Sequence, residues 1–368
     1  VRGVLPMMQE AARRGIAKCI VPLENADEAA LTDACRIYPA ASLPEVLQIL
    51  TSKRNAWPRP EEPAPSRSDC GDYREVKGQA HAVRAAEIAA AGGHNVLFIG
   101  APGCGKSMIA GRLPGILPSL TREEALETAP VYSALGMLRK ERLLPDEAPF
   151  RTAYPDITKS GLIGGGSRPV PGEISLAHKG VLFLDELAEF DRNVIQSLRQ
   201  PLETGKISIS RCGEFVEFPA DFLLAAATNP CGCGKLLEAE GRCSCTPFRA
   251  RQYLSRISRP ILDRIDLHVP LRRISFQNGG FAANESSQAI RERVIAARAL
   301  QKNRYRNENV FVNGKLNASM IRRYCSLGRD CEALLRSASD AACISMRGYE
   351  KILKVARTIA DLEDSEEI

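Results

Sequence analysis

The sequence predicts an α/β fold in which a parallel sheet, with helices on both faces, precedes an all-helical C-terminal region. Three observations lead to this fold class. Apolar segments of strand length alternate with helical patterns from about residue 72 to residue 275, which is the order typical of parallel sheets. A glycine-rich turn joins one of these strands to a helix. From about residue 284 onward the pattern is helical.

The composition narrows the class of protein. With 44% hydrophobic and 26% charged residues among 368, the chain resembles ordinary globular proteins, and its length predicts two or three domains. No apolar run approaches the ~18 residues of a membrane span and no signal-peptide pattern is present, so no membrane partner is expected. The net charge of +6 permits an acidic partner such as nucleic acid without requiring one.

Changes in composition along the chain predict its division into domains. A strand expected at 17–22 and a short helix at 43–50 indicate a small α/β unit. The stretch 57–66 is rich in proline and charge, which predicts a stiff linker. The expected units are residues 1–52, a linker at 53–71, an α/β domain at 72–283 and a helical domain at 284–368.

The larger domains have the following expected elements. An alanine-rich helix is expected over residues 80–91, ended by Gly92 and Gly93. Amphipathic helices are expected at 286–301 and 349–362. Four apolar segments have the length of buried strands, namely 96–99, 181–184, 222–227 and 265–269.

A glycine-rich turn, GAPGCGKS, follows the strand expected at 96–99 and precedes a helix. Its glycines allow successive backbone N–H groups to surround a phosphate. Lys106 would contact the β- and γ-phosphates, and the Ser107 hydroxyl would bind Mg²⁺. The chain is therefore expected to bind a nucleoside triphosphate. The expected contacts come from Gly100, Pro102, Gly103, Cys104, Gly105, Lys106 and Ser107.

Polar side chains follow two further strands. Asp185 and Glu186 come directly after the strand at 181–184, at the sheet edge where such folds place the phosphate loop. Asp185 would hold Mg²⁺ and Glu186 would polarise the attacking water. Asn229 ends another strand and could orient that water, although a turn-forming Asn-Pro pair is the alternative interpretation.

Cysteines are frequent and partly clustered. Twelve cysteines without a secretory signal favour a reduced, cytoplasmic setting over a disulfide framework. Cys231, Cys233, Cys243 and Cys245 form two C-x-C pairs with nine residues between them. Four soft ligands suit a structural, tetrahedral Zn²⁺. The spacing is tighter than the usual C-x-x-C, and reduced cysteines without a metal are the alternative.

Several longer sequence motifs closely resemble those of one family, the bacterial magnesium-chelatase-like AAA+ ATPases of the ComM/YifB competence group. The resemblance covers essentially the whole chain. It implies an AAA+ P-loop NTPase domain with an α-helical lid, assembling with itself as a ring, expected to be a hexamer. The motifs include VKGQ at 76–79, GGG at 164–166, PGEISLAH at 171–178, LRQPLE at 198–203 and LDRIDLHV at 262–269.

The resemblance implies roles for individual residues. Lys106 and Ser107 correspond to Walker A, Asp185 and Glu186 to Walker B, and Asn229 to sensor one. Val76 and Gly78 complete the nucleotide site. Arg264 is the expected arginine finger, with Arg256 and Arg259 as competitors, and Arg347 is the expected sensor two. A surface salt bridge would explain a lone arginine equally well.

The family's pattern also departs from this chain in places. Where relatives carry a His-His pair, this chain has FRTAYPD at 150–156, so no role that depends on those histidines is expected. Residues 1–50 resemble only the tail of the family's Lon-protease-like N-terminal domain, and both ends are expected to be truncated.

The function implied by the resemblance is an ATP-driven motor on single-stranded or branched DNA, a helicase that promotes branch migration during recombination. A loop at 164–180 and a β-hairpin at 206–218 are expected to project. Arg168, Lys206 and Arg211 on them would contact DNA phosphates, although solvated turn charges are the alternative. A chelatase-type remodeller of protein partners is the second hypothesis, and a nucleotide-gated scaffold with little turnover the third.

Overall fold

The computed structural model describes residues 1–33, 35–51, 55–60, 70–138, 143–167, 169–211, 214–238, 243–273, 283–342 and 344–368. Its centre is a parallel sheet of five strands in the order β11-β3-β10-β7-β4. A parallel sheet with an accompanying helical region is the predicted fold class, which is thereby confirmed. The strands are β3 (Val96–Gly100), β4 (Phe150–Ala153), β7 (Val181–Leu184), β10 (Leu223–Thr228) and β11 (Leu267–Leu271).

Two of the expected strands shift along the chain and a fifth was missed. The last strand begins at Leu267 rather than Ile265, because the Asp266 and Leu267 N–H groups both donate to Asn95 O just outside the ladder. Strand β10 lies one residue later than expected. Strand β4 escaped prediction since it is a short edge strand whose first three residues are only partly buried. A half-buried edge lacks the continuous apolar run of the central strands.

Both faces of the sheet are covered because successive side chains point to opposite sides. Val96 and Phe98 join one buried cluster and Leu97 joins the other. The first cluster receives helices α4 (Ala80–Gly92), α5 (Lys106–Gly111), α6 (Leu113–Ile116) and α14 (Ser287–Arg304). The second receives α9 (Glu173–Leu176), α10 (Arg192–Gln196), α11 (Arg199–Thr204), α12 (Pro247–Leu254) and α13 (Arg259–Leu262).

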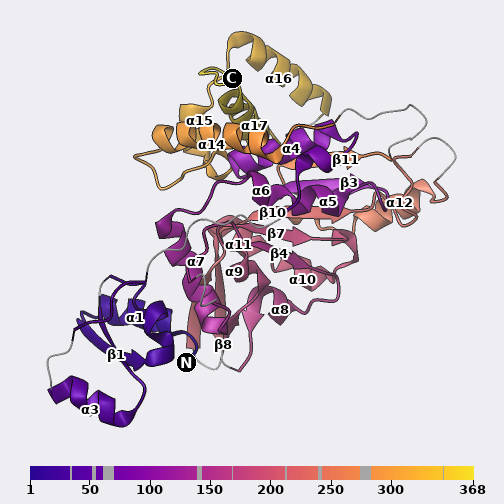
Figure 1. The fold of residues 1–368 in the computed structure, drawn as a ribbon. Helices are drawn as coiled ribbons and strands as arrows, with labels where there is room; N and C mark the ends of the chain where they lie inside the picture. Colours follow the sequence, from indigo (N-terminus) through magenta and orange to yellow (C-terminus); the bar gives the residue numbers. More distant parts are fainter. Residues whose placement is uncertain are drawn as a thin grey trace.

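The C-terminal helices lie together beside α4 on one side of the sheet (Figure 1). Buried polar groups hold them there: Asp361 accepts from Asn313 at 2.8 Å and from Arg304 at 3.0 Å. The buried His94 bridges the two regions, contacting Asp266 at 3.2 Å and Thr358 at 2.8 Å. These elements are α14, η5 (Asn313–Lys315), α15 (Ala318–Tyr324), α16 (Arg329–Ala342) and α17 (Met346–Leu362).

The N-terminal residues form a separate small unit that contacts the rest through α1 and α7 (Figure 1). Its two strands pair in parallel and its apolar cluster is distinct from those of the central sheet. Its elements are α1 (Val4–Arg13), β1 (Lys18–Pro22), η1 (Leu23–Asn25), α2 (Ala26–Ala29), β2 (Arg36–Ala40) and α3 (Leu43–Thr51).

The remaining elements connect these layers. They are η2 (Tyr73–Glu75), α7 (Arg122–Leu135), α8 (Lys159–Ile163), β5 (Gly164–Gly165), β6 (Val170–Pro171), η3 (Leu187–Glu189), β8 (Lys206–Arg211) and β9 (Glu214–Pro219). Strands β8 and β9 form the expected antiparallel hairpin. Within the described ranges, no helix has the length and apolar character needed to cross a membrane.

Candidate nucleotide site

Three neighbouring strands deliver the expected site residues to one edge of the sheet. In the strand order, β10 lies between β3 and β7, and all three run in parallel. The segments that follow them therefore meet at their carboxyl ends, where open parallel sheets bind ligands. Those segments carry the glycine-rich loop, Asn229 and the Asp185-Glu186 pair.

The glycines of the loop are required by its backbone. Gly103 has φ 77° and Gly105 has φ 93°, conformations that cost little only for glycine. A Cβ atom on Gly100 would lie 2.6 Å from Leu271 O, so β11 closes against the loop's first residue. Helix α5 begins directly after the loop, at Lys106. The tight turn expected from the sequence therefore forms at this place.

Lys106 is buried in the middle of the loop and contacts two strands. Only 8% of it is exposed. Its Nζ donates to Gly100 O at 2.6 Å and Ala101 O at 3.0 Å, and to the Asn229 side-chain oxygen at 3.1 Å. Burial lowers the pKa of this amine from its ordinary 10.5, and nearby acidic groups oppose the shift. An ammonium held among carbonyl oxygens is ready to exchange them for phosphate oxygens.

The Ser107 hydroxyl meets the carboxylate that follows β7. Its Oγ donates to Asp185 Oδ2 at 2.8 Å, and Asp185 Oδ1 accepts from the Glu186 N–H at 2.9 Å. A hydroxyl and a carboxylate at this separation are oxygen ligands of the kind Mg²⁺ prefers. Glu186 itself is exposed and has φ 54°, a left-handed conformation that costs of order 1–3 kcal/mol outside glycine. The backbone therefore turns this carboxylate sharply away from the strand axis.

Sequence reasoning missed the role of Gln79. This side chain is 3% exposed, and its Nε2 donates to Cys104 O at 3.3 Å and Arg272 O at 2.8 Å. It thus ties the glycine-rich loop to the residues after β11. Of the two other predicted nucleotide contacts in this segment, Val76 is buried with its carbonyl held by Asn284, and Gly78 has φ 62°. The segment VKGQ at 76–79 indicated that this region belongs to the nucleotide site. It did not indicate which atoms the glutamine side chain would bind.

Comparison with known proteins agrees with this geometry. The family described as "Magnesium chelatase, subunit ChlI" matches residues 72–278, and "Magnesium chelatase, subunit ChlI C-terminal" matches residues 284–368. "Competence protein ComM" of Haemophilus influenzae is 41% identical over 378 residues, covering 100% of this chain and 72% of that protein. The chain belongs to the magnesium-chelatase-like ComM/YifB family.

Other members and relatives match over different lengths. "Uncharacterized protein YifB" of Escherichia coli is 39% identical over 369 residues, covering 100% of this chain and 71% of that protein. "Magnesium-chelatase 67 kDa subunit" of Chlorobaculum parvum is 33% identical over 98 residues, 24% of this chain and 16% of that protein. The resemblance inferred from the sequence motifs is therefore confirmed.

In this ComM/YifB-family chain the four expected cysteines come together. Their sulfur atoms all lie within 4.8 Å of one another, and three of the separations are 3.4, 3.6 and 3.8 Å. These exceed a disulfide bond of about 2.05 Å. They match the ~3.8 Å between ligands of a tetrahedron with Zn–S bonds of about 2.3 Å. Backbone donation from Lys235 lowers the pKa of Cys233 to about 5, whereas at Cys243 backbone donation from Cys245 is outweighed by desolvation and the neighbouring thiols, which raise the pKa to about 11. The metal-binding thiolate is therefore favoured at Cys233. The cluster fits Zn²⁺.

The two arginines that the family pattern singles out lie at the opposite edge of the sheet. Arg264 precedes β11, and the Asn95 side chain, just before β3, donates to Arg264 O at 2.8 Å. Arg264 is ion-paired with Glu203 and donates to Pro260 O at 2.5 Å. Arg264 lines a cavity of about 200 Å³. Arg347 is exposed and lines this cavity as well. Neither is brought to the glycine-rich loop of its own chain.

The two competing arginines differ in their contacts. Arg256 pairs with Glu189 at 2.8 Å. Arg259, at the start of α13, is exposed and has no side-chain partner among the residues that the structure describes. Of the two, Arg259 is therefore the one whose side chain is available to another molecule, since Arg256 is already paired within the chain.

The residues expected to contact DNA are only partly described. Lys206 begins β8, is 60% exposed, and pairs with Glu217 on β9 at 3.3 Å. Arg211 ends β8 opposite Glu214, next to the hairpin turn, but its side chain lies outside the described residues, as does the whole of Arg168. Phe215, close to the same turn, is 67% exposed. The hairpin thus presents a lysine and an aromatic ring to its surroundings.

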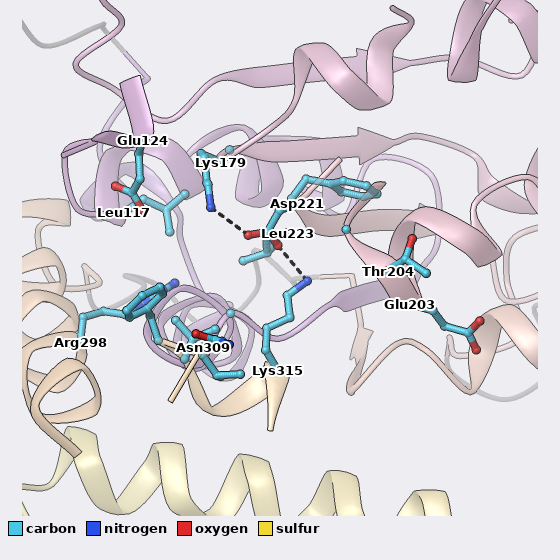
Figure 2. Close-up of a pocket in the computed structure, with 17 residues that line it drawn as sticks. Leu117, Glu124, Lys179, Glu203, Thr204, Asp221, Leu223, Arg298, Asn309 and Lys315 are labelled. Carbon is cyan, nitrogen blue, oxygen red and sulfur yellow. Dashed lines mark hydrogen bonds and ion pairs between the residues drawn. The ribbon is translucent and has the colours of Figure 1, made fainter. Parts of the chain in front are cut away.

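A cavity of about 390 Å³ lies at the amino ends of the strands, away from the nucleotide site (Figure 2). Asp221 accepts there from Lys179 at 3.2 Å and from Lys315 at 3.0 Å, as the dashed lines show. Burial alone would raise the pKa of Asp221, but the two lysines outweigh it and hold it at about 2. Since Lys315 belongs to the C-terminal helical region, this triad joins that region to the sheet.

Proposed function

We propose that this chain is a Mg²⁺-dependent ATPase of a ring-shaped motor that acts on DNA. One observation carries the ATPase: Ser107 donates to Asp185 while, beside them, Lys106 donates to Asn229. Three separate strands bring these groups together. ATP and Mg²⁺ are the substrate and ion to which this set of residues is suited.

Each residue has a distinct proposed task in the reaction. The N–H groups of residues 100–107 and the Lys106 ammonium bind the β- and γ-phosphates. Ser107 and Asp185 hold Mg²⁺, which when bound neutralises charge on the phosphate oxygens. Glu186 accepts a proton from the attacking water, and Asn229 orients that water in line with the bond to be broken. Lys106 then stabilises the charge that develops on the transferred phosphoryl group.

The positions of the arginines support the proposed ring. Arg264 and Arg347 are too far from the nucleotide of their own chain to contact it. We propose that both act on the nucleotide of a neighbouring subunit, as finger and sensor, in a homo-oligomeric ring that we expect to be a hexamer. We also propose that each subunit consists of a small N-terminal unit at 1–52, a linker at 53–71, an α/β domain at 72–283 and a helical domain at 284–368.

DNA is the proposed substrate of the motor because the hairpin β8–β9 carries Lys206 at its base and Arg211 next to its turn, and the chain has a net charge of +6. The named relative "Competence protein ComM" agrees with a role in handling DNA. Unwinding and branch migration are the proposed outcome. The second candidate, a chelatase-type remodeller of proteins, is favoured only by the 98-residue match to a magnesium-chelatase subunit.

The four clustered cysteines complete the proposal. Cys231, Cys233, Cys243 and Cys245 would hold a structural Zn²⁺, because their sulfurs lie within 4.8 Å of one another and four thiolates are a ligand set of structural zinc sites.

The test is the ATPase rate with and without single-stranded, duplex and forked DNA, at two salt concentrations. We expect stimulation by at least one DNA, abolished in Glu186→Gln. A Lys206→Ala variant is expected to weaken DNA binding and reduce the slope of log K against log salt by about 1, whereas Lys18→Ala, an exposed lysine of the N-terminal unit, leaves it unchanged. A rate that no DNA alters contradicts the motor on DNA but leaves the ATP site standing.

A further inference from the structure

The four-cysteine loop starts at the nucleotide site itself. Strand β10 ends at Thr228, the Asn229 side-chain oxygen accepts a hydrogen bond from Lys106 Nζ, and Cys231 follows two residues later. Cys231 is fully buried. Cys231, the first cysteine of the cluster, is therefore held two residues from Asn229, whose side chain contacts Lys106 in the proposed ATP site.

The same loop also lies against the glycine-rich loop from outside. Gly234, three residues after Cys231, has φ 76° and closes a turn by donating its N–H to Cys231 O at 2.9 Å. A Cβ atom on Gly234 would lie 2.6 Å from Cδ of Pro102. Pro102 belongs to the segment that surrounds the phosphates, so the turn made by the first two cysteines supports one wall of the phosphate site.

Further contacts fix the other sides of the four-cysteine loop. Tyr253 of α12 lies beside Gly232, where a Cβ atom on the glycine would be 3.9 Å from its ring. Glu238 pairs with Arg273, after β11, at 3.3 Å. The loop thus continues from β10 and touches α12 and the segment after β11. Its own residues from 230 to 238 and from 243 to 246 contain no helix or strand, so the cysteine cluster is what closes it.

We propose that a Zn²⁺ bound by the four cysteines clamps the phosphate loop, holding Gly234 against Pro102 and Asn229 against Lys106, so that metal content sets the affinity for ATP. This inference rests on the proposed ATP site. When the metal binds, each thiol loses its proton and the four thiolates share one dication, which removes their mutual repulsion. Without the metal, weak contacts between sulfurs 3.4–3.8 Å apart remain, and we expect them to hold the turn less firmly.

The first measurement asks whether the metal binds. Purified chain is reduced, stripped with a chelator and titrated with Co²⁺, a spectroscopic probe for Zn²⁺. We expect one ion per chain with sulfur-to-cobalt charge-transfer absorption, displaced by Zn²⁺. The bands should disappear in Cys243→Ser and Cys245→Ser and persist in Cys331→Ser, an exposed cysteine outside the cluster. No absorption in the wild-type chain overturns the site.

The second measurement asks whether the metal acts on the nucleotide site. The dissociation constant of a fluorescent ATP analogue is compared between Zn²⁺-loaded and stripped chain, with circular dichroism reporting the fold. We expect stripping to weaken binding about tenfold, the value of one charge-assisted hydrogen bond. Equal affinity in the two forms overturns the clamp. Failure of the loaded chain to bind the analogue at all overturns the proposed ATP site instead.

A variant that keeps the metal separates the clamp from general loss of structure. Gly234→Ala introduces the clash with Pro102 at a left-handed backbone position, while all four sulfurs remain. We expect it to retain one Co²⁺ per chain and to bind the ATP analogue more weakly. Gly328→Ala, at a glycine with open space around it, should change neither. Unchanged nucleotide affinity in Gly234→Ala contradicts the proposed contact.

Discussion

Replacing Arg264 by alanine tests whether the active site is completed by a second subunit. Arg264 lies before β11 and the glycine-rich loop lies after β3, the neighbouring strand. Each strand has five residues, so at about 3.3 Å per residue the two ends are about 16 Å apart. One arginine side chain cannot span that distance. If Arg264 contributes to hydrolysis, it does so on a neighbouring chain.

The expected loss can be divided between stability and rate. Within its own chain the Arg264 side chain is 11% exposed, pairs with the 54% exposed Glu203 and donates to Pro260 O, so removing it should cost about 1–3 kcal/mol. An arginine that stabilises the transition state in trans is worth 10³-fold or more, about 4 kcal/mol. We therefore expect Arg264→Ala to melt within a few degrees of the parent and bind ATP normally, but to hydrolyse it about 10³-fold more slowly.

The assay mixes two inactive chains. Lys106→Ala lacks a working phosphate site but keeps Arg264, and Arg264→Ala has the reverse defect. In randomly mixed rings, about half of the intact sites adjoin a chain that supplies the arginine. We expect mixing to restore a substantial part of the ATPase rate. Arg13→Ala, a 79% exposed arginine of the N-terminal unit, is the matched control and should be fully active alone.

The outcome that refutes this reasoning is full activity of Arg264→Ala, or inactivity that mixing does not relieve although the chains co-assemble. In the first case Arg259→Ala, the exposed and unpaired competitor among the described residues, is the next variant to mix. In the second case Arg264 acts through its own chain, and the pair with Glu203 is then a structural requirement.

Two further predictions concern the metal ligands and the triad in the second cavity. Ser107→Ala removes both the bond to Asp185 and a proposed Mg²⁺ ligand, so the Mg²⁺ concentration needed for half-maximal ATPase activity should rise at least tenfold. The control Ser197→Ala, directly after helix α10, should leave this concentration unchanged. An unaltered Mg²⁺ requirement in Ser107→Ala contradicts the ligand role. For Asp221 the folded pKa of about 2 lies below the ordinary 3.8, so its stabilisation is present above about pH 3.8 and lost as the pH falls toward 2. Full linkage gives about 2.4 kcal/mol, and because 41% of the side chain is exposed, screening leaves about 1 kcal/mol. Asp221→Asn should therefore lower the free energy of unfolding by about 1 kcal/mol at neutral pH, with the difference vanishing near pH 2 in denaturant titrations; a difference that is independent of pH would contradict the charge-based explanation.

Much of the nucleotide site was predictable because its signals are local. The GAPGCGKS turn needs glycines where φ is positive, and Gly103 and Gly105 have such angles. Asp185 and Asn229 follow buried strands, and the carboxyl ends of parallel strands share an edge. The meeting of the two C-x-C motifs could also be predicted, since four cysteines within 15 residues can reach one another whatever surrounds them.

Other features have no local signal. Among the described residues, strand β4 pairs with β7 alone and its first three residues are partly buried, so its residues carry no buried-strand pattern. The roles of Gln79 and Gly234 depend on which backbone atoms lie within about 4 Å, namely Arg272 O and Pro102. Partners separated by more than 100 residues are set by the packing of whole elements and not by either segment's own pattern.

The amino-acid sequence by itself determined the family, the order of strands along the chain and the chemical identity of the phosphate, Mg²⁺ and thiolate ligands, because each depends on residue type and short spacing. Only the tertiary structure placed β10 between β3 and β7, which brings Asn229 to Lys106. It alone put Arg264 and Arg347 in one cavity on the far edge of the sheet. The reason is that strand order and helix packing are settled by burial of apolar surface over the whole domain, which no single segment encodes.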